Sequence, residues 1–241
     1  MQILALNASP RKTKGSTHRI LNPFLEGAAE AGAIVETLMV RDLKVKPCLA
    51  CLACWLRTPE TCVQDDDMTE VLARARAADV WVLATPVYVD GMVGALKVVL
   101  DRMLPLIHPE MELREGHMRH PATDGVASKR MLLISVCGFY ELENFDPLVA
   151  HVRAISRNLN AEYVGAMLRP HAPGMEALER FGSPPTQVFD ACRQAGRQLV
   201  TDWRIDPALL DQVSRPLMPI EMYLQGFNDT MQRVKAKHQN A

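Results

Sequence analysis

The sequence predicts an α/β domain built around a parallel sheet, and two observations carry this prediction. Five short apolar runs, most of them rich in β-branched residues, alternate along the chain with segments whose apolar residues recur at helical spacing. Such alternation is typical of parallel strands, because a helix carries the chain back before each new strand. The 241 residues, 48% of them hydrophobic, suit one compact domain with additions.

Each element can be placed in order along the chain. The expected strands cover residues 3–6, 34–40, 80–84, 131–136 and 163–168. The expected helices cover residues 16–31, 68–77, 91–103, 145–159 and 186–203. Ser16 and Thr17 open the first helix and the acidic residues 65–67 precede the second, because hydroxyl and carboxylate groups cap helix starts. Lys97 and Asp101, four residues apart, are interpreted as an ion pair within the third helix.

Charge and composition exclude several classes of protein. The formal net charge is -1 and no block of Lys or Arg stands out, so neither a nucleic acid nor an anionic membrane surface is an expected partner. The first residues lack the features of a signal peptide, and the apolar run 80–89 is too short to span a bilayer. A cytoplasmic location is therefore expected. Because thiols stay reduced there, clustered cysteines indicate metal or redox chemistry more readily than structural disulfides.

The stretch NASPRKTKGSTHRI, residues 7–20, follows the first expected strand. In an open α/β sheet, ligands bind beyond the carboxyl ends of the strands. Here backbone N–H groups, hydroxyls, Arg11 and the start of a helix would converge on an anion, most simply a phosphate. The stretch matches neither the nucleotide P-loop nor the G-x-G-x-x-G turn. From these residues alone, the stretch is equally well interpreted as an ordinary turn whose lysines are exposed to water and bind no phosphate.

The loops after the third and fourth strands suggest a site for a planar ring. In TPVYVDG, residues 85–91, Pro86 and Gly91 fix a loop that offers backbone groups to a ring edge and apolar surface to its face. In SVCGFY, Cys137 and Gly138 end the strand and Phe139 is placed to close over the same site. A lone cysteine at a strand end is more often a small core residue than a nucleophile.

Together the three loops resemble the flavodoxin-like NAD(P)H-dependent FMN reductase family. The resemblance rests on Ser-Pro-Arg-Lys at 9–12 with Gly-Ser-Thr at 15–17, and on Thr-Pro-Val-Tyr at 85–88 with Leu-Lys-x-x-x-Asp-Arg at 96–102. It extends from residue 1 to about residue 200. It implies a doubly wound, five-stranded parallel sheet in the order 2-1-3-4-5, with helices on both faces.

The resemblance also implies where FMN binds. Its phosphate would be held by Ser9, Arg11, Ser16 and Thr17. Its isoalloxazine ring would rest against Pro86, Val87, Tyr88, Val89, Asp90 and Gly91, with Cys137 and Gly138 on the other side. One departure from the family is Asn7-Ala8-Ser9 in place of the common Gly-Ser, which leaves the contact at Ala8 open.

The stretch PCLACLACWLRTPETC, residues 47–62, contains Cys48, Cys51, Cys54 and Cys62 in the spacing C-x2-C-x2-C-x7-C. Three close thiolates and a more distant one are what a cubane iron–sulfur cluster needs, because a short loop wraps three corners and a fourth ligand closes the set. The spacing, and its place after the second strand, resemble the iron–sulfur flavoproteins, a branch of the same family. The resemblance thus implies a [4Fe-4S] cluster.

Three other interpretations of these cysteines stay open. A zinc site with four cysteine ligands would prefer two separated C-x2-C pairs, and here the pairs overlap. A disulfide, for example between Cys54 and Cys62, would form if the thiols oxidise in air. The third interpretation is that the cysteines are redox-active or unligated and hold no metal.

The expected function is that of an FMN-dependent NAD(P)H oxidoreductase: a reduced nicotinamide gives hydride to the flavin, and electrons pass to an unknown acceptor, directly or through the cluster. Because the flavin supplies the chemistry, no side chain is assigned as catalytic acid or base. The alternative is an electron carrier or redox sensor without its own nicotinamide reductase activity. A phosphatase is disfavoured, because the C-x5-R stretch from Cys51 to Arg57 has no glycine to wrap a phosphate and does not follow the first strand.

The expected organisation is one FMN-binding domain, residues 1–205, with the cysteine-rich insertion at 47–62. Residues 105–129 are expected to cover the flavin, and residues 206–241 to form an extension that contacts a second copy. An equally good interpretation is that both segments are polar additions to the surface without these roles. The resemblance implies a homodimer or homotetramer.

Overall fold

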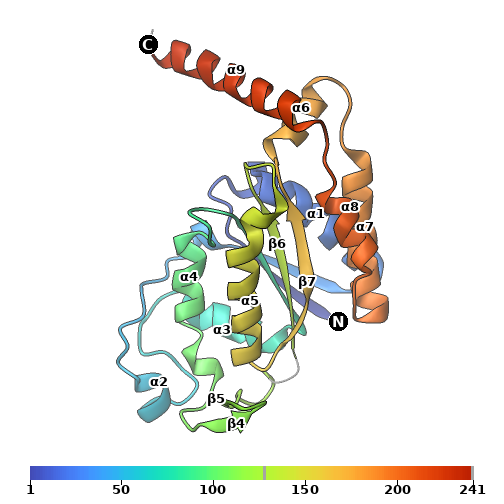
Figure 1. The fold of residues 1–241 in the computed structure, drawn as a ribbon. Coiled ribbons are helices and arrows are strands. Elements are labelled where there is room, and N and C mark those ends of the chain that lie inside the picture. Colours follow the sequence, from blue (N-terminus) through green and yellow to red (C-terminus); the bar gives the residue numbers. More distant parts are fainter. Residues whose placement is uncertain (127–128, 240–241) are drawn as a thin grey trace.

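A five-stranded parallel sheet forms the centre of the molecule (Figure 1). The structure is a computed structural model that describes residues 1–126 and 129–239. The strands are β1 (Gln2–Asn7), β2 (Ile34–Met39), β3 (Val80–Pro86), β6 (Arg130–Val136) and β7 (Glu162–Arg169). They lie in the order β2-β1-β3-β6-β7, and each neighbouring pair is parallel. The predicted α/β fold and the predicted strand order are confirmed.

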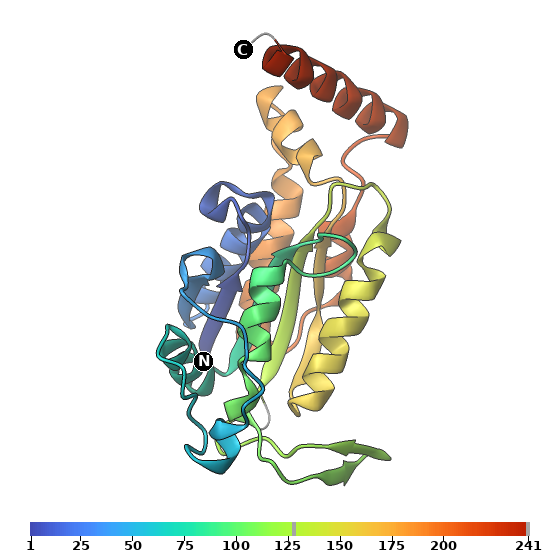
Figure 2. The same cartoon turned by 90° about the vertical axis from the view of Figure 1, so that its left-hand side faces the viewer.

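Helices cover both faces of this sheet (Figures 1 and 2). One face carries α1 (Ser16–Glu30), α7 (Thr186–Asp202) and α8 (Pro207–Ser214), and the other carries α3 (Met68–Ala77), α4 (Gly94–Asp101) and α5 (Asp146–Asn158). Alternate strand residues enter two separate apolar cores: in β1, Ile3 and Ala5 enter the first, whereas Leu4 and Leu6 enter the second. Burial on both faces explains why the central strands β1, β3 and β6 are nearly continuous apolar runs.

The sequence does not predict several further elements. They are α2 (Ala53–Leu56), α6 (Pro173–Arg180), α8, the antiparallel hairpin of β4 (Glu112–Arg114) and β5 (His117–Arg119), the 3-10 turns η1 (Lys12–Lys14), η2 (Val40–Asp42), η3 (Leu104–Leu106) and η4 (Leu142–Phe145), and the C-terminal helix α9 (Ile220–Gln239). Most are too short or too polar to give a periodic apolar pattern.

Two glycines allow α1 and α7 to cross in close contact. A Cβ atom at Gly27 would overlap the carbonyl oxygen of Arg193, and one at Gly196 would overlap the carbonyl oxygen of Phe24. Ion pairs between the two helices flank the crossing. The backbones therefore touch at this point with no side chain between them.

We expect Gly196→Ala to lower the free energy of unfolding by about 1–3 kcal/mol, because the added methyl group meets backbone atoms that cannot rotate away. The matched control is Gly226→Ala in α9, where nothing lies within 4 Å of the added Cβ. That control should leave stability unchanged or slightly raise it, since alanine favours a helix. Urea denaturation followed by circular dichroism measures both. Equal stability of Gly196→Ala and the wild type would show that the helices are not in backbone contact.

Residues 105–129, expected to cover the flavin, start beside α2 and form the hairpin at the amino-terminal end of the sheet (Figure 1). The indole N–H of Trp55 donates to the carbonyl of Ile107 at 2.8 Å. The Trp55 ring also lies 5.0 Å from the ring of His120. Residues 127–128 lie outside the described residues. The described part of the segment is thus held at the end of the sheet opposite the loops after β1, β3 and β6, and it does not cover them.

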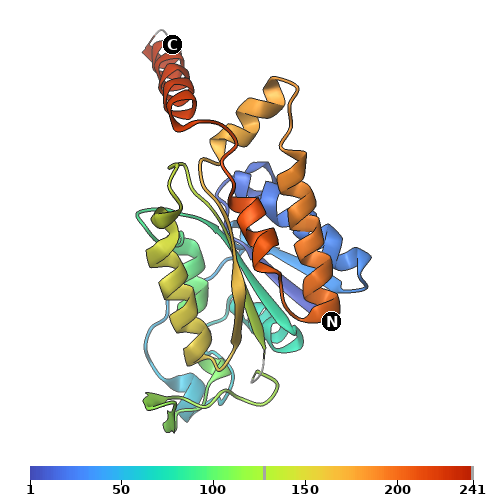
Figure 3. The same cartoon turned by 45° about the vertical axis from the view of Figure 1, so that its right-hand side comes forward.

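The body of the domain continues past residue 205, because α8 belongs to the core and Val213 is fully buried. The buried guanidinium of Arg169 donates to the carbonyls of Val213, Ser214 and Arg215 at 2.6, 3.2 and 2.7 Å. The negative end of the α8 dipole partly compensates this cation, although burial still lowers the pKa of Arg169 to about 10. This contact fixes the chain just before α9, which projects from the body (Figure 3).

No helix in the part of the chain that the structure describes is both long enough and apolar enough to cross a membrane.

Candidate functional site

Two adjoining cavities lie where the loops after β1, β3 and β6 meet, at the carboxyl end of the sheet. Their volumes are about 180 and 730 Å³, and Val87, Cys137 and Gly138 line both. The smaller cavity is also lined by Ser9, Pro10, Arg11, Ser16, Thr17, Pro86, Tyr88, Val136, Ala172 and Pro173. The larger is also lined by Val89, Asp90, Phe139, Tyr140, Glu141, Ile220, Tyr223, Leu224, Phe227 and Asn228. Of the residues predicted to contact FMN, Gly91 alone lines neither cavity.

The loop after β1 gathers the polar groups of a candidate anion cradle in the smaller cavity. The N–H of Ser9 donates to Asn7 Oδ1 at 3.0 Å, and Ser9 Oγ accepts from the N–H of Arg11 at 3.3 Å. The Arg11 guanidinium donates to the Ser16 hydroxyl at 3.1 Å and pairs with the Glu176 carboxylate of α6 at 3.5 Å. α1 begins here without a side-chain cap. Hydroxyls, a guanidinium and the positive end of a helix thus surround one space, as phosphate binding requires.

The loop after β3 is a tight turn held in a strained conformation. Tyr88 and Gly91 exchange two backbone hydrogen bonds of 2.9 and 3.1 Å. Between them, Val89 and Asp90 have φ angles of 46° and 59°. A positive φ is costly for a β-branched residue, and such strain concentrates at ligand contacts. The turn leaves Val89 99% exposed, directed into the larger cavity.

The loop after β6 joins the two cavities to the C-terminal helix. Cys137 is buried, its sulfur accepts from the N–H of Phe139 at 3.3 Å, and burial raises the pKa of its thiol. The burial and the raised pKa of Cys137 agree with the small core residue expected from the sequence, and not with a nucleophile. The carbonyl of Gly138 accepts a hydrogen bond from the hydroxyl of Tyr223 in α9.

Sequence reasoning missed the contribution of the C-terminal helix to the site. The α9 residues Ile220, Tyr223, Leu224, Phe227 and Asn228 form one wall of the larger cavity. A signal was present, because the apolar residues of this segment are spaced four and three apart, as on one face of a helix. Four residues that line the smaller cavity were also not predicted, because apolar residues do not by themselves indicate a ligand. They are Pro10, Val136, Ala172 and Pro173.

The four clustered cysteines lie in the long connection between β2 and α3. Cys48 and Cys51 are exposed, Cys54 in α2 is buried, and Cys62 is half-buried. α2 lies at the amino-terminal end of the sheet, whereas the loops after β1, β3 and β6, which line the two cavities, lie at its carboxyl end (Figure 1). Within one chain the two candidate redox sites are therefore at opposite ends of the domain.

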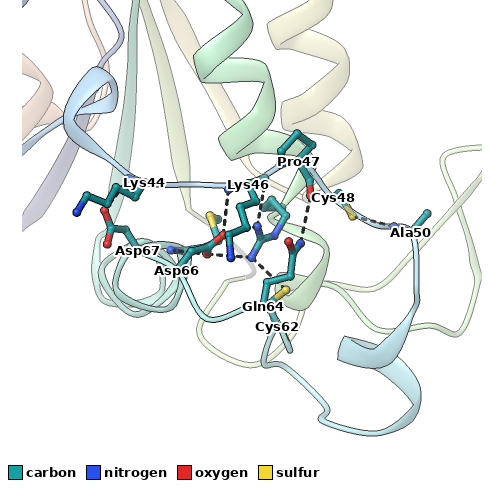
Figure 4. A network of polar contacts seen from close by, with 11 residues as sticks. Lys44, Lys46, Pro47, Cys48, Ala50, Cys62, Gln64, Asp66 and Asp67 are labelled. Carbon is teal, nitrogen blue, oxygen red and sulfur yellow. Dashed lines mark hydrogen bonds and ion pairs between the residues drawn. The ribbon is translucent and has the colours of Figure 1, made fainter.

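A network of polar contacts that includes Lys46, Cys62 and Asp66 organises this connection (Figure 4). Arg102, at the end of α4, and Asp66 have side chains that are 1% and 3% exposed, and their closest contact is 2.8 Å. Arg102 also donates to the carbonyl of Lys46 at 2.7 Å and to the sulfur of Cys62 at 3.2 Å. Burial alone would raise the pKa of Asp66, but hydrogen bonds from Arg102 and from two backbone N–H groups lower it below its usual value. The pair fixes both ends of the cysteine connection.

The four thiols have the donor chemistry of an iron–sulfur cluster, and N–H···S bonds to Cys62 and Cys48 are of the kind that stabilise cluster thiolates. Burial, and then the neighbouring sulfur of Cys62, raise the pKa of Cys54. Among residues 1–126 and 129–239, no three Cys, His, Asp or Glu side chains gather closely enough to hold a metal ion. The four thiols thus match a cluster in their chemistry, but in this structure their sulfurs are not gathered around a common point.

A doubly wound parallel sheet with an anion cradle after its first strand defines a protein of the flavodoxin-like class. Within that class, the chain belongs to the NADPH-dependent FMN reductase family, which residues 1–134 match. The resemblance found in the sequence is thereby confirmed.

Curated relatives of the chain include iron–sulfur flavoproteins. One from Methanosarcina thermophila is 37% identical over 114 residues, 47% of this chain and 58% of that protein. One from Methanocaldococcus jannaschii is 32% identical over 106 residues, 44% of this chain and 53% of that protein. The matches thus span little more than half the length of these relatives.

Among solved structures, an FMN-dependent NADH-azoreductase from Bacillus anthracis in complex with FMN has a TM-score of 0.61. The sequences are 18% identical, and the match covers 83% of this chain and 99% of the azoreductase. At this identity the likeness concerns the fold.

Proposed function

We propose that the protein is an FMN-dependent NAD(P)H oxidoreductase. The observation that carries the proposal is the meeting of three loops at one cavity, with an anion cradle at the start of α1 and an apolar space beside it. Membership of the NADPH-dependent FMN reductase family supports it. When bound, FMN accepts hydride from NAD(P)H and passes two electrons to an acceptor.

The residues of the chain bind and orient the cofactor in this proposal. Ser9, Arg11, Ser16 and Thr17 would hold the phosphate. Pro86, Val87, Tyr88, Val89 and Asp90 would line the ring, with Gly91 closing the turn and Cys137 and Gly138 opposite. The N–H groups of Val89 and Asp90, which take no part in the two hydrogen bonds between Tyr88 and Gly91, would donate to the polar edge of the ring and favour negative charge there. No side chain is needed to take up or give a proton.

The test is to reconstitute the protein with FMN and add NADPH or NADH without oxygen. The flavin absorbance near 450 nm should fall within minutes. Flavin that binds and stays oxidised would overturn the reductase function and leave the electron carrier or redox sensor. Failure to bind FMN would overturn both.

We expect Gly15→Ala to weaken FMN binding by about tenfold or more, because the added Cβ would occupy the place of the Ser9 hydroxyl. A hydrogen bond to a charged phosphate contributes about 1.5–3 kcal/mol. Gly94→Ala is the matched control, since nothing lies within 4 Å of a Cβ there and Gly94 lines neither cavity. Fluorescence titration of FMN measures both affinities. An unchanged affinity for Gly15→Ala would contradict the cradle.

We also propose that Cys48, Cys51, Cys54 and Cys62 hold a [4Fe-4S] cluster, as the spacing and the curated relatives named iron–sulfur flavoproteins support. The loop must close around the cluster for the four sulfurs to meet, and the two exposed cysteines have room to do so. Protein prepared without oxygen should contain about four iron atoms and four acid-labile sulfides per chain. Stoichiometric zinc, or near-zero iron, would overturn the cluster.

We further propose that a second copy covers the outer part of α9. Met231 and Val234 are 38% and 42% exposed and continue the apolar face of Leu224 and Phe227 beyond the larger cavity. A helix with an uncovered apolar face usually has a partner. Light scattering should give a multiple of the 26.9 kDa chain mass. A monomer at micromolar concentration would contradict the proposal.

A further inference from the structure

We propose that the chain has a second ligand site at the amino-terminal end of the sheet, and that this site binds a small molecule with a diphosphate group. The β4–β5 hairpin, the end of α5 and the first residues of β6 and β7 form the site. It shares no residue with the two cavities at the carboxyl end of the sheet. It therefore goes beyond the proposed function and does not depend on it.

A cavity of about 680 Å³ lies between these elements. The arginines that line it are Arg114, Arg119, Arg130 and Arg157, and the carboxylates are Glu115 and Glu162. Cavities of roughly 300–1,000 Å³ are usual for small-molecule sites. A single phosphate ion would fill only a small part of this volume, so the cavity has room for a larger phosphorylated molecule.

Positive charge is concentrated in this cavity. With His117 neutral, four arginines and two glutamates give its lining a formal charge of +2, whereas the whole chain has a formal charge of -1. The excess of arginine is therefore a local feature and does not follow from a basic composition. A concave site lined mainly by one sign of charge raises the local concentration of small ions of the opposite sign.

Two of the guanidinium groups have no carboxylate partner. In the part of the chain that the structure describes, no carboxylate oxygen lies within 4 Å of the guanidinium of Arg119 or Arg157. Glu112 lies opposite Arg119 in the hairpin, but its carboxylate pairs with Arg114 at 3.2 Å. Arg119 and Arg157 thus carry the charge that an anionic ligand would neutralise.

The pairing of β4 with β5 brings the cations of the hairpin to one face. Arg114 lies opposite His117, and Arg119 is on the same face because side chains alternate along a strand. All three line the cavity, whereas Leu113 and Met118 on the opposite face do not.

Two contacts hold the cavity in shape. The guanidinium of Arg114 donates to the carbonyls of Arg157 and Asn158, at the end of α5, at 3.2 and 3.3 Å. This ties the hairpin to the end of α5, beside which it lies in Figure 1. The guanidinium of Arg130 lies over the ring of Trp203, 4.3 Å from its centre. Side chains that are already held in place lose less conformational entropy when a ligand binds.

The chemistry of the lining favours phosphate groups. Guanidinium groups form paired, charge-assisted hydrogen bonds with phosphate oxygens. A diphosphate presents oxygens on two linked groups, so it can accept from Arg119 on the hairpin and from Arg157 on α5 at the same time. The arginines surround one cavity and do not form an extended basic stripe, which suits a small molecule and not a nucleic acid.

The first experiment measures binding by calorimetry. Protein saturated with FMN, which occupies the candidate anion cradle after β1, is titrated with pyrophosphate and with ADP. Pyrophosphate should bind with a Kd below about 100 μM, and Arg119→Gln and Arg157→Gln should each raise that Kd about tenfold, because each removes a charge-assisted hydrogen bond. A lower Kd for ADP would identify the ligand as a nucleotide, and an equal Kd would assign recognition to the diphosphate group by itself. If neither anion binds at about 1 mM, there is no such site.

The matched control is Arg153→Gln. Arg153 is exposed, lies one turn before Arg157 on α5 and does not line the cavity. This variant makes the same change in net charge, so its affinity for pyrophosphate should equal that of the wild type. An equal loss in Arg153→Gln and Arg157→Gln would show a general effect of charge and would contradict a specific site.

Hydrogen exchange gives a second readout. A diphosphate that bridges the hairpin and α5 should slow amide exchange in residues 112–119 at least about threefold, because local opening would have to break the bridge. The same anion should leave exchange of the hairpin unchanged in Arg157→Gln. Unchanged exchange in the wild type at saturating pyrophosphate would mean that the anion does not bridge these elements.

Arg11→Gln separates this site from the proposed function. The variant removes the cation of the candidate anion cradle and should leave the Kd for pyrophosphate unchanged. If the protein does not bind FMN, the proposed function fails, and the titrations are carried out on Arg11→Gln. If Arg11→Gln abolishes pyrophosphate binding, the anion binds in the cradle and the second site is wrong.

Discussion

Arg102→Met is expected to lower the free energy of unfolding by about 3–5 kcal/mol, because it leaves the carboxylate of Asp66 buried without its cation. The carbonyl of Lys46 and the sulfur of Cys62 lose their donor in the same step. The double variant Arg102→Met/Asp66→Asn should be more stable than Arg102→Met alone, because no uncompensated charge stays buried. Urea denaturation of the wild type, Arg102→Met, Asp66→Asn and the double variant gives the coupling energy.

An exposed pair on the same helix is the control. Lys97 and Asp101 form the ion pair expected from the sequence, with side chains 46% and 48% exposed. Lys97→Met should change the free energy of unfolding by no more than about 0.5 kcal/mol, as is usual for a surface pair. Similar losses in Lys97→Met and Arg102→Met would mean that burial of the Arg102 pair has been overestimated.

Acid should weaken the buried ion pair of Arg102 and Asp66. The pKa of Asp66 is lowered in the folded protein, so its carboxylate stabilises the fold at neutral pH. That contribution is present above the pKa of the unfolded carboxyl and is lost as the pH falls through the lower folded value. In Asp66→Asn this part of the acid dependence should be missing.

The sheet could be predicted from the sequence because its central strands β1, β3 and β6 are buried on both faces. The run VWVLA at 80–84 has no polar residue to interrupt the apolar pattern, and the helices between the strands pack one stripe on the sheet. The acidic residues before α3 were interpreted as caps, and Asp66 does accept from the N–H of Met68 at 3.1 Å. Its second partner, Arg102, lies 36 positions away, and no local pattern reports such a contact.

The candidate anion cradle could also be predicted from the sequence, because its residues lie close together along the chain. Ser9, Arg11 and Ser16 lie within eight positions of one another, and the turn between β1 and α1 brings their polar groups together. The larger cavity is not local. Phe139 and Phe227 line it together from distant parts of the chain, and the path of α9 depends on contacts of Arg169 and His171 that periodicity does not show.

The stability of the protein is expected to fall by about 3 kcal/mol as the pH is lowered from 6.5 to 4, because His171 is held neutral. Its ring is fully buried, and burial first, then the nearby Arg169 cation, lower its pKa from 6.5 to about 4. Its Nε2 accepts from the N–H of Leu217 at 3.0 Å and faces the Arg169 guanidinium at 3.3 Å. The ring proton is therefore on Nδ1, and a second proton would have to displace both donors.

The sign of the effect follows from the lowered pKa. Between pH 4 and 6.5 the unfolded chain binds a proton at this histidine and the folded chain does not, so unfolding is favoured as the pH falls. The stability that depends on a neutral His171 is fully present above pH 6.5 and is lost as the pH falls to about 4. Because Leu217 lies just before α9, protonation should also loosen that helix, whose Tyr223 packs on the His171 ring.

Urea denaturation at pH 7.5, 6, 5 and 4 measures this dependence. His171→Gln keeps an acceptor for the N–H of Leu217 and cannot titrate, so its unfolding free energy should be lower at pH 7.5 and should vary less with pH. His238→Gln, at an exposed position near the end of α9, should follow the wild type at each pH. If His171→Gln loses stability with acid as steeply as the wild type does, the acid dependence comes from other groups, and His171 does not control the attachment of α9.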